Sequence, residues 1–164
     1  MNSELTILEI IGLAVKSEQN AAAFYRDFAK LIKNELVHAR FLALAEEEDK
    51  HEQMLIDYYK KLTGEQAPPP AIPGDIQTAE GSPPLFSIDS IEDLFKLAIE
   101  REVEAREFYT NAAKGASDNS GKNMLEYMAK IEGIHEMTLK AELETYLHDG
   151  KWYANHVDIQ LVGP

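Results

Sequence analysis

The 164-residue chain contains no cysteine, which excludes disulfide bonds, zinc ribbons and thiolate-bound iron centres. Aromatic residues make up only 9% of it, while alanine, glutamate and leucine are abundant, and this composition favours helix over sheet. No apolar run approaches the roughly 20 residues of a membrane-spanning helix. The N-terminal stretch MNSELTILEIIGLAV also lacks the basic start of a signal peptide. We therefore expect an all-α protein of the cytoplasm.

Positive charge is scarce as well. Sixteen lysines and arginines stand against 29 aspartates and glutamates, which gives a net charge of −13. Because an acidic surface repels both nucleic acid and anionic membranes, we expect neither of them as a partner. The length suits one domain that can bury a hydrophobic core.

Proline and glycine are concentrated in a few places and divide the chain. The stretch TGEQAPPPAIPGDIQTAEGSPP, residues 63–84, is unfavourable for helix and strand alike, and GASDNSG, residues 115–121, forms a shorter break. A third break is predicted next to Asn34, a residue that can cap the following helix. The sequence therefore predicts four long helices, at residues 4–32, 35–62, 88–114 and 119–147.

The two halves of the chain are related in sequence. LAVKSEQNAAAFY (residues 13–25) matches LAIEREVEAREFY (residues 97–109), and AEEEDKHE (residues 45–52) matches AKIEGIHE (residues 129–136), both with an offset of 84 positions. A constant offset indicates a duplicated helical hairpin. At about 3 Å per extended residue, the proline-rich segment between the hairpins can run the length of a bundle. We expect residues 1–147 to form a four-helix bundle with a long crossover at residues 63–87.

The buried stripe of each predicted helix carries charged residues at its middle. Steps of four and three residues along each helix give apolar residues, a few tyrosines and, beyond the middle of the last helix, Glu142, which we expect to reach water. Two helices contribute one mid-helix Glu each, and the other two contribute a Glu followed three residues later by a His. These residues are Glu18, Glu48, His51, Glu102, Glu132 and His135.

Antiparallel packing would bring the six side chains to one level of the bundle. Four carboxylates buried together are too costly to remain uncompensated, so they must take up protons or hold cations. Two divalent ions would balance four carboxylates, and the imidazoles would complete their coordination. Oxygen-rich ligation with one imidazole per ion suits iron or manganese, with zinc as an alternative.

The chain resembles the rubrerythrin group of ferritin-like di-metal carboxylate proteins over roughly residues 5–147. The resemblance rests on the motifs above and on an E…FY helix that is followed by LAEEEDKH, residues 44–51. The resemblance implies a ferritin-like bundle of two duplicated hairpins joined by the crossover. It also implies that Glu18 and Glu102 are terminal ligands and that Glu48 and Glu132 are bridging ligands. His51 and His135 would be imidazole ligands. Two features depart from the family: the rubredoxin-like iron centre is missing, and Ala105 stands where those proteins carry an additional Glu involved in redox-linked iron movement.

The resemblance implies an oxidoreductase. We expect a non-haem di-iron protein that reduces hydrogen peroxide or dioxygen at a bridged carboxylate and histidine centre, with electrons from another protein or a small reductant. A ferroxidase or iron-handling protein, a dimanganese catalase-like protein and a structural bundle without redox activity are the alternatives.

Other residues near the motifs leave alternatives open. Tyr25 and Tyr109 lie two turns beyond Glu18 and Glu102 on the same stripes, where they either pack in the core or hydrogen-bond to a ligand. The acidic neighbours of Glu48 are predicted to form a solvated face, and they are Glu46, Glu47, Asp49 and Glu52. The tail at residues 148–164 is predicted to pack on the bundle or on a second subunit, since a homodimer is the commonest assembly.

Overall fold

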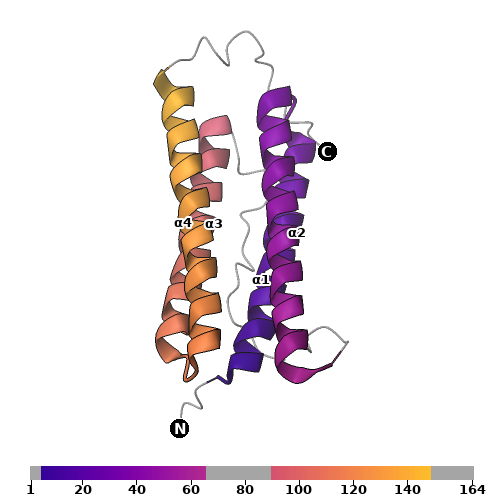
Figure 1. The fold of residues 1–164 in the computed structure, drawn as a ribbon. Helices are drawn as coiled ribbons and strands as arrows, with labels where there is room; N and C mark the ends of the chain where they lie inside the picture. The colour runs from indigo at the N-terminus through magenta and orange to yellow at the C-terminus, as the bar shows by residue number, and fades with distance from the viewer. Residues whose placement is uncertain (1–4, 66–89, 149–164) are drawn as a thin grey trace.

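The computed structural model describes residues 5–65 and 90–148, and these residues form four helices without any strand (Figure 1). The helices are α1 (Ile7–Leu31), α2 (Glu35–Thr63), α3 (Ile91–Gly115) and α4 (Asn119–His148). The all-α prediction is confirmed, and each helix end lies within a few residues of its predicted position. Most of the predicted crossover (residues 66–87) and the tail from residue 149 lie outside the described residues.

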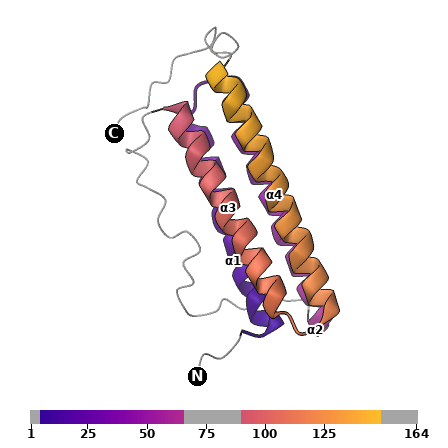
Figure 2. The same cartoon turned by 90° about the vertical axis from the view of Figure 1, so that its left-hand side faces the viewer.

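The helices pack as two hairpins that face each other. Helix α1 packs mainly against α2, and α3 packs mainly against α4, while contacts between the hairpins are fewer. Figures 1 and 2 show that each hairpin is antiparallel and that the two hairpins lie side by side along their length. The architecture is the ferritin-like four-helix bundle that the sequence predicts.

Local sequence explains where the helices begin and end. Thr6 and Glu9 form a capping box at the start of α1, in which each residue satisfies a backbone N–H of the other. Ser90 caps α3 by accepting a hydrogen bond from the backbone N–H of Asp93 at 3.1 Å. At the end of α2, Gly64 has φ of 75°, a left-handed conformation that a side chain would strain.

Asn34 caps α2, as predicted, and is only 3% exposed. Its Oδ1 atom accepts hydrogen bonds from the backbone N–H groups of Leu36 and Val37, both at 3.1 Å. Asn34→Ala is expected to lower the free energy of unfolding by about 1 kcal/mol, because both donors lose this acceptor. Equilibrium urea denaturation of the metal-free protein measures the change, and Asn34→Ser, which keeps an acceptor, is the control. Equal stability of the alanine variant and the natural protein would contradict the assignment.

The hydrophobic core consists of two clusters at opposite ends of the bundle. One cluster contains the C-terminal part of α1, the N-terminal parts of α2 and α3, and Leu139 of α4. The other contains the opposite parts of the same helices. The largest buried side chains of the first cluster are Tyr25, Phe28, Phe41, Phe95, Leu44 and Leu139. Those of the second cluster are Tyr109, Ile11, Leu55, Leu125 and Met128. Between the clusters lies a buried layer of charged residues, which we call the polar layer.

Candidate metal centre

The polar layer contains all six of the residues that the sequence singles out. Each of them is buried, with an exposed fraction between 1% and 6%. They are Glu18 on α1, Glu48 and His51 on α2, Glu102 on α3, and Glu132 and His135 on α4. The two hairpins place them at one level because every one of these residues stands near the middle of its helix. The structure therefore brings together the set that the helical stripes predicted.

The first group of the polar layer surrounds His51. The Nδ1 atom of His51 lies 3.0 Å from Oε2 of Glu48, 3.4 Å from Oε2 of Glu18 and 3.5 Å from Oε1 of Glu132. One ligand atom from each of these four residues lies within 4.8 Å of the others. We call these four residues the His51 group.

The second group repeats this arrangement around His135. Its Nδ1 atom lies 3.3 Å from Oε2 of Glu102, 3.4 Å from Oε2 of Glu132 and 3.5 Å from Oε1 of Glu48. Again the four ligand atoms lie within 4.8 Å of one another. We call these residues the His135 group. The two imidazole rings stack on each other, with centroids 5.2 Å apart and planes inclined by 16°.

Two glutamates belong to both groups. Glu48 directs Oε2 to His51 and Oε1 to His135, and Glu132 directs Oε1 to His51 and Oε2 to His135. Glu18 and Glu102 each belong to one group only. A pair of cations in this layer would therefore share two carboxylates and hold one further carboxylate each, which is the division between bridging and terminal ligands.

The unsatisfied atoms of the polar layer test whether metal ions fit here. Within the described residues, Oε1 of Glu48, Oε1 of Glu132 and Nδ1 of His135 are buried and make no hydrogen bond. Buried polar atoms without a partner are costly and need an explanation. These three atoms converge with the other carboxylate oxygens and imidazole nitrogens of the layer, and oxygen-rich sets with imidazole are the donors that iron or manganese accepts. The residues present fit a pair of divalent ions.

Two tyrosines hold the unshared glutamates from the opposite hairpin. The hydroxyl of Tyr25 on α1 donates a hydrogen bond to Oε1 of Glu102 on α3, and the hydroxyl of Tyr109 on α3 donates one to Oε1 of Glu18 on α1. Burial, followed by the negative charge of the neighbouring carboxylates, raises the pKa of both phenols well above the ordinary value, so both keep their protons. Each bond leaves Oε2 of its glutamate directed at a histidine.

Protons balance the charges of the polar layer when it holds no metal. Burial raises the pKa of Glu18 well above its usual range, and burial together with the nearby carboxylates raises the pKa of Glu102 to about 8. Burial acts in the same direction on Glu48, but the approach of His135 and His51 outweighs it and lowers that pKa to about 2. For both histidines, burial lowers the pKa, but the surrounding carboxylates outweigh it and raise the value to about 12. At neutral pH these shifts favour the imidazolium form of both histidines and the protonated form of Glu102, and the pKa of Glu18 is shifted in the same direction as that of Glu102.

Metal uptake should consequently release protons. Glu102 and both histidines hold protons in the metal-free chain at pH 7, and the raised pKa of Glu18 acts in the same direction. Because a divalent ion must displace these protons, the apparent affinity for it should rise as the pH is raised from 6 to 8. About three protons should leave when both groups are filled, from Glu102 and the two histidines, and any proton held by Glu18 adds to this number. Isothermal titration calorimetry in two buffers with different ionisation enthalpies measures this number. An affinity that does not change with pH would contradict the protonation described here.

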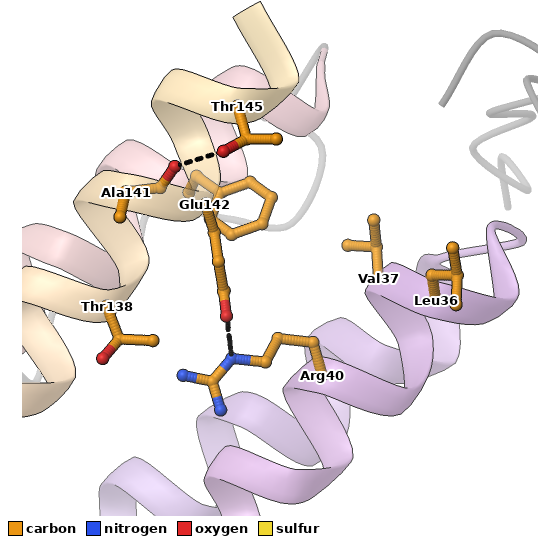
Figure 3. Close-up of a pocket in the computed structure, with 8 residues that line it drawn as sticks. Leu36, Val37, Arg40, Thr138, Ala141, Glu142 and Thr145 are labelled. Carbon is orange, nitrogen blue, oxygen red and sulfur yellow. Dashed lines mark hydrogen bonds and ion pairs between the residues drawn. The ribbon is translucent and has the colours of Figure 1, made fainter. Parts of the chain in front are cut away.

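Two acidic residues outside the six have partners that the sequence did not reveal. Glu47 does not belong wholly to a solvated face, because its Oε2 atom lies 3.3 Å from Nε2 of His135. Glu142 forms an ion pair with Arg40, with Oε1 lying 2.9 Å from Nε, rather than simply reaching water (Figure 3). Both contacts join α2 to α4. The signal for Glu47 was its position beside the buried stripe, and the signal for Glu142 was its position on the stripe itself.

Comparisons with known proteins agree with the helical fold. A sequence model described as Rubrerythrin matches residues 9–143. A solved structure of a hypothetical protein from Pyrococcus furiosus superposes on the chain with a TM-score of 0.64, at 28% sequence identity and with 90% of this chain and 92% of that chain covered. A search of curated proteins gives no match. Among the described residues, no helix has the length and apolar character that crossing a membrane would demand.

Proposed function

The chain belongs to the rubrerythrin family, and from this premise we propose that it is a non-haem di-iron redox protein that reduces hydrogen peroxide or dioxygen. The observation that carries the proposal is the pair of buried groups that share Glu48 and Glu132. Two ions held by shared carboxylates would lie next to each other, so that each could supply one of the two electrons that the reduction of peroxide needs.

The residues of the polar layer would hold the ions. Glu18 and His51 would complete the coordination of one ion, and Glu102 and His135 that of the other, with Glu48 and Glu132 shared between them. Iron is the metal that we propose, and manganese and zinc are the alternatives for the same donor set. A bound iron pair supplies the two electrons that convert hydrogen peroxide and two protons into two water molecules.

The chain's own contribution is to orient the ligands and to limit the access of water. The tyrosine hydrogen bonds fix Glu18 and Glu102, and the apolar clusters on both sides of the polar layer separate it from the ends of the bundle. No cysteine is present to hold a second iron centre within these 164 residues. We therefore include in the proposal an external electron donor, either a protein or a small reductant.

Metal analysis followed by rapid mixing tests the proposal. Protein purified without added metal should contain about two iron ions per chain. After anaerobic reduction, mixing with hydrogen peroxide should oxidise the iron quickly, with one peroxide consumed per iron pair. Full metal loading without any oxidation would contradict a redox function and favour a structural bundle.

The same experiment separates the related functions. Iron retained far above two ions per chain would indicate iron storage or delivery rather than peroxide reduction. Manganese in the purified protein, with oxygen released from peroxide in the absence of a reductant, would indicate a catalase-like reaction. Either result would replace the peroxide or dioxygen reductase proposed here.

A further inference from the structure

The duplication of the hairpin makes the two metal-binding groups near copies of each other. The offset of 84 positions relates Glu18 to Glu102, Glu48 to Glu132 and His51 to His135, and it also relates the two tyrosines that bond across the hairpins. The two groups would be unequal wherever the offset pairs two different residues and one of these residues lies next to a histidine of the polar layer. Such a position lies immediately before the shared glutamates.

That position holds Glu47 in the first hairpin and Ile131 in the second. Oε2 of Glu47 lies 3.3 Å from Nε2 of His135, on the side of the ring that faces away from the other carboxylates. An isoleucine side chain cannot accept a hydrogen bond, so Ile131 offers nothing comparable to His51. Within the described part of the chain, every hydrogen-bond or ion-pair partner of His51 contacts Nδ1 and none contacts Nε2.

Glu47 also lies near a cation. The same Oε2 atom lies 4.0 Å from Nη1 of Arg40, and Nε of Arg40 lies 2.9 Å from Oε1 of Glu142. Arg40 on α2 and Glu142 on α4 line a pocket of about 400 Å³. Figure 3 shows their side chains pointing toward each other. The chain of contacts thus leads from Glu142 on α4 through Arg40 and Glu47 on α2 to His135 on α4. The side chains of Glu47 and Arg40 are 40% and 21% exposed, so this contact is partly open to solvent.

A carboxylate next to the outer nitrogen of a metal-binding imidazole has a known physical effect. It accepts a hydrogen bond from that N–H, fixes the tautomer whose other nitrogen is free to bind metal, and makes that nitrogen a stronger donor. We propose that Glu47 is a positioning residue that acts in this way on His135 alone, so that the His135 group binds a divalent ion more tightly than the His51 group. This inference rests on the metal centre proposed above.

A titration of the metal-free protein with Co²⁺, followed by the visible absorption of the bound ion, tests the inference. The natural protein should bind Co²⁺ in two resolved steps. Glu47→Leu removes the acceptor and should weaken the tighter step by about 10- to 100-fold, with less than about a threefold change in the other step. Glu47→Gln keeps an oxygen acceptor without its charge and should give an intermediate loss. Glu46→Gln, on the exposed side of α2, is the matched control and should leave both steps unchanged.

A second variant assigns the two steps to the two groups. Ile131→Glu supplies His51 with the carboxylate that only His135 has, so it should strengthen the weaker step and bring the two affinities together. In the Co²⁺-loaded protein, the exchangeable ring N–H protons of the binding histidines are shifted out of the main proton NMR spectrum. One of these signals should exchange with solvent more slowly than the other, and Glu47→Leu should remove that difference.

The outcomes distinguish this inference from the proposed function. Two equal steps in the natural protein, or an equal effect of Glu47→Leu on both steps, would overturn the inference and leave the metal centre intact. A protein that binds neither Co²⁺ nor iron would overturn both. Circular dichroism of each variant shows whether the helices are unchanged, so that a loss of affinity can be attributed to the site.

Discussion

Glu48→Ala is expected to abolish the binding of both metal ions. Glu48 directs one oxygen to the His51 group and the other to the His135 group, so its removal takes a ligand from each. Each group would keep three ligand atoms, and one of those three would come from Glu132, which serves both groups. The metal content measured after loading and desalting should fall from about two ions per chain to less than about 0.2.

Two further variants give this prediction its contrast. Glu18→Ala removes an unshared ligand, so it should leave the His135 group complete and one ion in the chain. Glu46→Ala changes an exposed residue of the same helix and should keep both ions. If Glu48→Ala retained one ion, or if Glu18→Ala lost both, the division into shared and unshared carboxylates would be wrong.

Removal of both metal ions, which together would stabilise the folded chain by about 8 kcal/mol, should lower the thermal midpoint by about 16–32 °C. Ions that bind only the folded chain stabilise it by about 4 kcal/mol per site when the free ion is a thousand times above its dissociation constant. For a chain of this size, each kcal/mol shifts the midpoint by about 2–4 °C. Backbone contacts between the two hairpins are fewer than those within each hairpin, and ions in the polar layer would bind side chains from both hairpins. Differential scanning calorimetry with and without a chelator measures the shift.

The Glu48→Ala variant is the control for the chelator. Because it should hold no ion, its midpoint should be the same with and without the chelator. A natural protein that loads with metal yet melts at one temperature in both conditions would show that the ions bind outside the polar layer or do not distinguish the folded chain from the unfolded chain.

The helices and their level in the bundle could be predicted because they depend on local rules. Proline-rich and glycine-rich breaks set the helix ends, and Asn34 provides a cap that needs only its immediate neighbours. The constant offset of 84 positions then implied equal hairpins, and equal hairpins place mid-helix residues at one depth. Distance along the bundle axis follows from counting residues, so the gathering of the six residues could be foreseen.

The contacts around the axis could not be predicted in the same way. The sequence suggested that Tyr25 and Tyr109 could bond to a ligand, but each lies two turns from a glutamate of its own helix and bonds instead to one in the opposite hairpin. The sequence predicts Glu47 as one of several solvated acids beside Glu48, yet its Oε2 atom lies 3.3 Å from Nε2 of His135 on α4. Which flank of a helix faces its neighbour depends on how the hairpins are rotated against each other, and the spacing of residues within a single helix does not contain that angle.

Neither hairpin holds a complete set of ligands. The first supplies Glu18, Glu48 and His51, but the fourth member of the His51 group, Glu132, comes from the second hairpin. Two separate copies of one hairpin, paired about a two-fold axis, would contain every ligand but would have to remain identical. Fusion of the copies into one polypeptide removes that constraint, so that a single substitution can alter one ion's surroundings while its counterpart keeps the inherited residue.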